Sequence, residues 1–333
     1  MKTTNGIVVG ATKGAGAFTL TELAVVLAVV TLLAALRLLP ALEHAKSQAQ
    51  SSRCLSNMHQ LMSAALMYAD DSRGLWFYNQ PGGAGSQQDW VTDEMDWGAM
   101  IYNGGAECTN WQLLVTPPVS GGGVATPGSF FTPYINSPSV YKCPADPSMA
   151  LAPNAGPRAR SYSANAAVGT IWSVGNLAGP NNTWADGPVT GQWLGGEADD
   201  NQRYGYCYQK TSDMVHPIPV NLWIFAEEHP DSINDSEFQV QIAQYTLGGG
   251  FIDMPANYHS RAGTFSFADG HVEIHKWLGT IAGSAGYVQG GNPSPFPTRT
   301  VTTTADLSDL NWLQARTSYP SNPAFARGFP QPH

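Results

Sequence analysis

Three consecutive residues, Glu227-Glu228-His229, have side chains that can transfer protons and can also bind metal ions. They follow the apolar run 220–226, which is typical of a buried strand that ends in a polar turn. A catalytic site would need a nucleophile, a further carboxylate or a histidine at metal-ligand spacing, and none accompanies the three residues in the sequence. The pattern therefore favours a turn or strand-end role, and we expect no enzymatic activity.

A second group of polar residues lies in an acidic stretch. Oxygen ligands for Ca²⁺ could come from Asn201 and from four carboxylates: Asp186, Glu197, Asp199 and Asp200. The spacing does not match an EF-hand loop, and acidic loops are common without an ion. Calcium is the one cofactor that the sequence suggests, and otherwise we expect none.

The four cysteines are Cys54, Cys108, Cys143 and Cys207. No Cys-x-x-Cys or Cys/His spacing indicates a zinc site. An even number of cysteines in an oxidising compartment indicates disulfides, for which three connectivities are open. We predict the pairs Cys54–Cys143 and Cys108–Cys207.

A β-hairpin is predicted over 263–277, where Asp269-Gly270 separates two runs of alternating polar and apolar residues. A two-residue turn would pair Phe267 with Val272 and Phe265 with Ile274. His259 lies upstream of the hairpin, with nine residues between it and Asp269. Asp269 has a sufficient role as a turn residue, and His259 could bond a carbonyl group across the sheet. A metal site or an acid/base pair made by the two residues is the alternative.

The elements that must hold these residues begin with an apolar stretch. Residues 18–39 are about the ~20 residues that a helix needs to cross a bilayer, and the run 23–36 has no charge. A cleaved secretory signal is the alternative, but the run is longer than a typical signal core and lacks a small-x-small cleavage site. Glu22 lies just inside the apolar run, where an ionised group in lipid costs a few kcal/mol and needs a partner.

The stretch 40–71 continues the helix as an amphipathic segment. Pro40 should kink or locally open it, and 71–74 supply the stop. One apolar face is predicted by residues at three- and four-residue steps: Leu42, Ala45, Ala49, Leu55, Met58, Met62, Ala65 and Ala69.

The junction Gly16-Ala17-Phe18-Thr19-Leu20-Thr21-Glu22-Leu23 resembles the class III leader junction of type IV pilins and type II secretion pseudopilins. The resemblance implies cleavage between Ala17 and Phe18 by the prepilin peptidase, followed by N-methylation of Phe18. It also implies that Glu22 pairs with the amino terminus of a neighbouring subunit during filament assembly. Ala17 departs from the family, in which Gly usually precedes the cut.

Later landmarks are similar to one prepilin-associated subfamily. They include residues 53–61, 68–71, 141–146 and 160–165, and the spacing of His259 with Asp269-Gly270 is the hallmark from which this subfamily takes its name. A closing segment at 310–314 also resembles it. The resemblance therefore touches the chain from Gly16 to Gln314.

The overall composition limits the fold classes and the kinds of partner that are possible. Charged residues make up 12% of the 333-residue chain, which also has 35 Gly and 24 Pro, so a loop-rich fold with strands is expected. The formal charge of −9 and the absence of a Lys/Arg cluster argue against nucleic acid as a partner. Loops in 74–140 and 171–201 carry seven tryptophans that either pin loops to the core, which we favour, or form a platform for polysaccharide: Trp76, Trp90, Trp97, Trp111, Trp172, Trp184 and Trp193.

These observations predict a pilin-like α+β protein in which a long N-terminal helix packs on an antiparallel sheet with large loop insertions. The expected organisation is a leader (1–17), an assembly helix (18–39), its amphipathic continuation (40–71), a head (72–288) and a Pro/Gly/Thr-rich tail (289–333) with a short helix at 306–316.

The resemblance implies a filament subunit, single-pass in the bacterial inner membrane with its head in the periplasm. The length of the chain, well above that of a small major pseudopilin, favours a minor or specialised subunit. Its expected partners are itself, other pseudopilins, the prepilin peptidase and the assembly platform. The alternative is a membrane-anchored module that binds polysaccharide.

Overall fold

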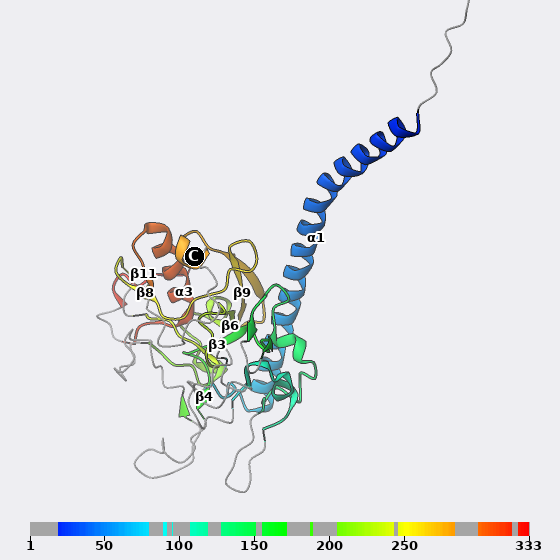
Figure 1. The fold of residues 1–333 in the computed structure, drawn as a ribbon. Helices are drawn as coiled ribbons and strands as arrows, with labels where there is room; N and C mark the ends of the chain where they lie inside the picture. Colours follow the sequence, from blue (N-terminus) through cyan, green and yellow to red (C-terminus); the bar gives the residue numbers. More distant parts are fainter. Residues whose placement is uncertain are drawn as a thin grey trace, which may run out of the picture. The chain divides into compact units, whose positions relative to one another are not determined.

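The computed structural model describes residues 19–79, 89–91, 95, 107–118, 128–150, 155–171, 187–188, 205–242, 246–283, 299–321 and 326–332. The chain divides into two compact units, Met1–Gln48 and Ala49–His333. The boundary lies within one helix, α1 (Leu20–Asp71), and each unit is described by itself (Figure 1).

In the first unit, α1 is an apolar helix whose side chains are exposed. The exposed fraction is 86% for Leu20 and 57% for Leu33. Within the described residues, α1 is the one helix long and apolar enough to span a membrane. The helix continues through Pro40 without interruption.

In the second unit, the remaining turns of α1 form part of the hydrophobic core. Met58, Met62, Ala65 and Ala69 are buried as their spacing predicts, whereas Leu55 is only half-buried. The helix ends at Asp71, and the chain turns away through Arg73 and Gly74, which both have positive φ. The predicted end of the helix is therefore confirmed.

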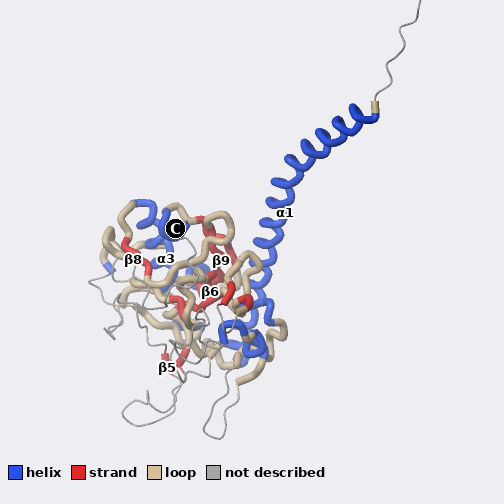
Figure 2. Tube along the Cα trace, in the orientation of Figure 1, coloured by secondary structure: helices blue, strands red, loops and turns tan. Residues whose placement is uncertain are grey.

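A five-stranded sheet is the centre of the second unit, in the order β10-β9-β6-β3-β7. Two of its strands, β6 and β9, are labelled in Figure 2. Its strands are β3 (Tyr162–Asn165), β6 (Trp223–Glu227), β7 (Glu237–Phe238), β9 (Ala262–Phe267) and β10 (Val272–Lys276). All neighbouring strands are antiparallel except β3 and β7, which are parallel. The predicted α+β class, with an antiparallel-rich sheet, is confirmed.

Short elements surround this sheet. They are η1 (Glu107–Thr109), η2 (Trp111–Val115), η3 (Pro138–Tyr141), β1 (Met149–Ala150), β2 (Gly156–Pro157), β4 (Thr170–Ile171), β5 (Gly187–Pro188), η4 (Thr211–Asp213), η5 (Pro219–Asn221), β8 (Gly250–Phe251), α2 (Thr280–Gly283) and β11 (Arg299–Thr300). A final helix, α3 (Thr304–Thr317), is capped by Thr303, whose side chain accepts from the Asp306 N–H. Leu310 and Leu313 on α3 are buried, so the helix predicted at 306–316 is confirmed.

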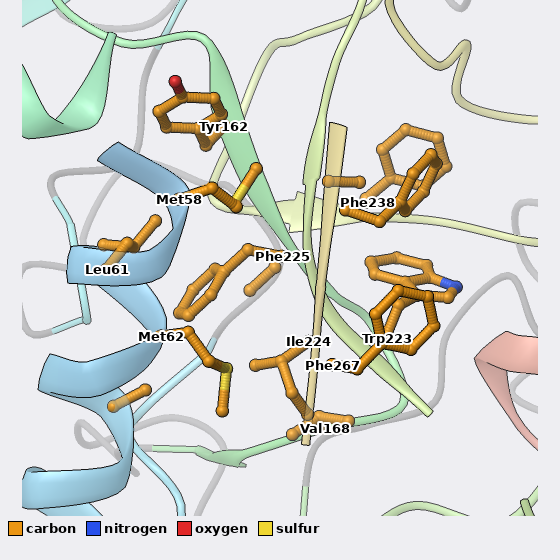
Figure 3. Close-up of a cluster of buried hydrophobic side chains, with 14 of the residues drawn as sticks. Met58, Leu61, Met62, Tyr162, Val168, Trp223, Ile224, Phe225, Phe238 and Phe267 are labelled. Atoms are coloured by element: carbon orange, nitrogen blue, oxygen red, sulfur yellow. The ribbon is translucent and has the colours of Figure 1, made fainter. Parts of the chain in front are cut away.

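Aromatic side chains fill the space between α1, the sheet and the loops. Figure 3 shows Met58 and Met62 of α1 beside Phe225 of β6. The Phe225 ring stacks on Phe77 with centroids 5.3 Å apart and lies 4.9 Å from Trp90. Loops distant in the sequence are thereby fastened to one strand by the burial of large aromatic area.

Asn165 at the end of β3 joins three elements. Its side chain is fully buried, donates to the carbonyl oxygens of Trp223 and Thr317 at 2.9 Å each, and accepts from the Ala167 N–H at 2.9 Å. These bonds connect β3 to β6 and to the end of α3. A buried amide that satisfies three backbone groups stabilises one arrangement of these segments.

The hairpin of β9 and β10 forms as predicted, but its register differs by one residue. Val272 pairs with Ser266 and Ile274 pairs with Thr264, whereas the two-residue turn predicted Phe267 and Phe265 as their partners. The Gly270 N–H donates to the Phe267 carbonyl, and Gly270 has φ +97°. Asp269-Gly270 therefore occupies the last two positions of a four-residue turn followed by a bulge, which adds a residue to one side of the hairpin.

Candidate functional site

Four side chains that could bind a metal ion lie close together in the second unit: Cys54, Cys143, Glu227 and His259. Their ligand atoms all lie within 4.8 Å of one another. The two cysteines and Glu227 are fully buried, and His259 is 7% exposed. We refer to these four residues as the Cys/Glu/His cluster.

Each member of the cluster comes from a different segment. Cys54 lies on the buried face of α1, and Cys143 follows η3 in the turn Cys143-Pro144. Glu227 is the last residue of β6. His259 precedes β9, in a turn closed by the His259 N–H donating to the Ala262 carbonyl.

Short contacts connect the four side chains. The Cys54 thiol donates to Glu227 Oε1 at 2.7 Å. His259 Nε2 lies 3.1 Å from the same oxygen and 3.5 Å from Cys143 Sγ. One carboxylate oxygen and one imidazole nitrogen are thus in contact with both sulfur-bearing residues.

A second set of contacts orients the cluster from outside. Ser51 Oγ lies 2.9 Å from His259 Nδ1, which directs the other nitrogen, Nε2, toward the sulfur atoms. The Thr264 N–H donates to Glu227 Oε2 at 2.8 Å. The Ala145 N–H donates to Cys143 Sγ at 3.3 Å, and the Tyr162 hydroxyl lies 3.2 Å from Cys54 Sγ.

Burial and mutual contacts perturb the protonation of the cluster. Burial lowers the pKa of His259, but the hydrogen bonds to Cys54 and Glu227 outweigh it and raise this pKa to about 10. Burial opposes ionisation of Glu227, yet the bond to His259 holds the pKa of this carboxyl below its usual value. Burial, reinforced by Cys54 and Glu227, raises the pKa of the Cys143 thiol. These shifts favour an imidazolium–carboxylate pair of His259 and Glu227 beside a neutral Cys143 thiol when no metal is bound.

His259 and Asp269 belong to one motif in the sequence, but they have different partners in the structure. Asp269 Oδ1 lies 2.6 Å from His271 Nδ1 and accepts from the His271 N–H in the exposed hairpin turn. The turn role predicted for Asp269 is confirmed. The imidazole of His259 contacts Ser51, Cys143 and Glu227, so the carbonyl bond predicted for it is wrong.

Adjacent residues of the Glu227-Glu228-His229 segment also differ in their roles. Glu227 joins the cluster, whereas Glu228 Oε1 accepts from the Ser232 hydroxyl at 2.8 Å. Consecutive residues of an extended chain alternate between the two sides of a sheet, which separates the two carboxylates. The predicted strand-end role is therefore correct, and the partners of Glu227 lie far away in the chain, where local spacing cannot identify them.

None of the four cysteines, all of which lie within the described residues, forms a disulfide, so both predicted pairs are wrong. Cys54 and Cys143 do lie close together, but they share their site with Glu227 and His259. Cys108 belongs to a small separate cluster with Met95, Ala150 and Ile233, whereas Cys207 packs against the main core. Different surroundings thus explain why Cys108 and Cys207 do not form the second predicted pair.

Glu22 takes part in a helix cap at the start of α1. Its Oε2 accepts from the Thr19 N–H and from the Thr19 hydroxyl, both at 2.8 Å, and the Glu22 N–H donates to Thr19 Oγ1 at 3.2 Å. This is a capping box, in which Thr19 and Glu22 satisfy each other's backbone groups. The Thr-x-x-Glu spacing was visible in the sequence but was not used to predict it.

The remaining predicted site residues divide into two groups. Ala17, Phe18 and the proposed calcium ligands Asp186, Glu197, Asp199 and Asp200 lie outside the described residues. So do Trp97, Trp172, Trp184 and Trp193. Trp76 and Trp90 are buried, which confirms that they pin loops, whereas Trp111 is 50% exposed.

Comparisons with models of protein families, with curated proteins and with solved structures found no match to this chain.

Proposed function

We propose that this chain is a pilin-like structural subunit, anchored in a bacterial inner membrane by α1 and assembled into a filament through the same helix. The observation that carries the proposal is the composition of α1. Its first part exposes apolar side chains over several turns with a carboxylate in the first turn, and its last part belongs to the core of an α+β unit.

The exposed apolar side chains call for a nonpolar environment. Leu23, Leu27, Val30 and Leu33 are each 52–57% exposed, and complete burial of a Leu or Val side chain is worth about 1.5–3 kcal/mol. A bilayer supplies this environment to one copy, and neighbouring helices supply it in an assembly. Membrane anchoring and helix-mediated assembly are therefore two uses of one surface.

Glu22 supplies the polar component. Its carboxylate is satisfied in part by Thr19, but an ionised group near lipid remains costly unless a positive partner is present. The resemblance of the junction 16–23 to prepilin leaders supports removal of residues 1–17. Such a cut would keep Thr19, and with it the helix cap, and would create a positive amino group at Phe18.

Assembly would then pair Glu22 of one subunit with the amino group of another. The partners are further copies of this chain and other pseudopilins, with the prepilin peptidase and an assembly platform acting before the filament forms. The head projects on the periplasmic side, and its role is structural rather than enzymatic.

Substitutions at Glu22 test this proposal. Glu22→Gln retains a residue type that serves in a capping box but removes the charge, whereas Glu22→Ala removes both. We expect both variants to insert into membranes and to lose filament yield at least about tenfold, in line with the 1–2 kcal/mol or more of a desolvated charge pair. Glu43→Gln on the same helix is the control.

The measurements are membrane fractionation, filament yield by sedimentation, and the N-terminal sequence of the protein from its native membrane. Normal yield from Glu22→Gln together with low yield from Glu22→Ala would assign Glu22 to the cap alone and contradict charge pairing. A native protein that retains residues 1–17 would contradict processing.

A further inference from the structure

We infer that Cys54, Cys143, Glu227 and His259 bind one Zn²⁺ ion, which fastens α1 to the sheet of the second unit. The inference concerns a site within the residues from Ala49 onward, and it holds whether or not the chain forms filaments.

The donor set determines the choice of metal. Two sulfur atoms, one imidazole nitrogen and one carboxylate oxygen form a mixed set of soft and borderline ligands. Ca²⁺ and Mg²⁺ require oxygen ligands, so the two sulfur donors and the imidazole nitrogen argue against them. Zn²⁺ takes Cys, His and carboxylate ligands in tetrahedral sites.

The ligand atoms, all within 4.8 Å of one another, lie close to the separations that a tetrahedral ion requires. With bonds of about 2.3 Å to sulfur and about 2.0–2.2 Å to nitrogen and oxygen, a tetrahedral zinc ion places its ligand atoms about 3.4–3.8 Å from one another. Cys143 Sγ and His259 Nε2 are 3.5 Å apart, and His259 Nε2 and Glu227 Oε1 are 3.1 Å apart. The 2.7 Å contact between Cys54 Sγ and Glu227 Oε1 is a thiol hydrogen bond, which coordination would replace with a longer separation.

The surroundings already orient three of the four ligands as a metal requires. Metal-binding histidines use one nitrogen for the ion and the other for a hydrogen bond that fixes the ring, and Ser51 occupies this position at Nδ1. The Thr264 N–H holds the second oxygen of Glu227, and the Ala145 N–H stabilises negative charge on Cys143 Sγ. Three of the four ligands thus have an outer contact that favours the metal-bound form.

Binding exchanges protons for the ion. Zn²⁺ replaces the thiol protons of Cys54 and Cys143 and the proton shared by His259 and Glu227, and these protons pass to solvent. The four protein ligands complete a tetrahedral shell with no open position, which is typical of structural rather than catalytic zinc.

The consequence for the fold is a tie between distant segments. Cys54 is separated from Glu227 by 173 positions in the sequence. Ser51 is separated from His259, which it orients, by 208 positions. One ion would therefore hold α1, at Cys54, against β6 and the turn before β9.

Metal analysis of the full-length chain, extracted in detergent without chelator, tests the inference. We expect one zinc ion per chain by elemental analysis, and loss of this zinc in Cys143→Ser and Glu227→Gln. Cys207→Ser, which removes a thiol outside the cluster, should keep it. Ser51→Ala should retain the ion but weaken its affinity about 10–100-fold in chelator competition.

Variants that change the ligand without removing it guard against misfolding as an explanation. Cys143→His should still bind one ion, and after replacement of Zn²⁺ by Co²⁺ its sulfur-to-cobalt absorption should fall to about half that of the native chain, because one of two thiolates remains. An equal signal from both proteins would contradict the ligand assignment.

Two further outcomes would overturn the inference. One is a native chain that binds no stoichiometric zinc although all four ligands are present. The other is a chain that carries a Cys54–Cys143 disulfide in place of the metal, detected by mass spectrometry of peptides prepared without reductant. Filament yield is not part of these measurements, so their result is independent of the proposal for Glu22.

Discussion

Acidification should destabilise the second unit through His275, which lies on β10 against α3. Its ring stacks on Trp312 with centroids 3.6 Å apart, and its Nε2 is buried without a hydrogen-bond partner. Burial, reinforced by the charge of Arg316, lowers the pKa of His275 to about 4. The folded protein therefore holds this histidine neutral.

The sign and size of the effect follow from linkage. The folded pKa lies below the unfolded value of 6.5, so stability is complete above pH 6.5 and is lost as the pH falls toward 4. Between pH 8 and pH 5, these two values correspond to a loss of about 2 kcal/mol, which partial exposure of the ring reduces to about 1–2 kcal/mol.

The assay is urea unfolding of the full chain in detergent, followed by tryptophan fluorescence at pH 8 and pH 5. His275→Phe keeps a flat ring on Trp312 but cannot take a proton, so it should lose about 1–2 kcal/mol less stability on acidification than the native chain. His59→Gln, on an exposed turn of α1, should behave as the native chain does. An identical loss in His275→Phe and the native chain would refute the reasoning.

Two further predictions concern packing in the second unit. Asn165→Ala leaves three buried backbone groups without their partner and should cost about 3–6 kcal/mol in the free energy of unfolding; a loss below 1 kcal/mol in urea unfolding would show that the site can rearrange. Gly263→Ala places a Cβ 2.7 Å from the Ala256 carbonyl oxygen and should cost about 1–3 kcal/mol, while Gly156→Ala, with its nearest atom at 3.7 Å, serves as the matched comparison. Equal thermal midpoints for these two glycine variants would contradict the steric argument.

Periodicity in the sequence predicted the elements that depend on local pattern. The apolar run and the amphipathic stripe led to one helix with two kinds of surface, and Met58 and Met62 are buried as expected. The helix predicted at 306–316 likewise forms, although α3 begins at Thr304 and is capped by Thr303. These features depend on residues within one or two turns, where the spacing itself determines which side chains share a face.

The hairpin marks the limit of local pattern. Asp269-Gly270 identified the turn, but the same dipeptide fits both a two-residue turn and a longer turn with a bulge. The choice depends on the bond from Gly270 to Phe267 and on the packing of both strands. A difference of one residue in the turn changed every pair in the predicted register.

The Cys/Glu/His cluster could not be predicted from spacing. Its ligands are single residues on four segments, and no two are close enough in the sequence to form a recognised metal motif. One sign was available: Glu227 ends an otherwise uncharged strand of buried residues, where a carboxylate requires a partner. Identifying that partner requires the tertiary fold.

The division of α1 between two units has a practical consequence for the preparation of shortened chains. Truncation at residue 72, where the helix ends, would remove Met58, Met62 and Cys54 from the interior that they fill. A shortened chain that starts just before Ala49 would lack most of the apolar surface of the first unit. It would retain every residue of α1 that belongs to the second unit. The boundary between the exposed apolar part of this protein and the unit that contains the sheet thus lies inside a helix, not at its end.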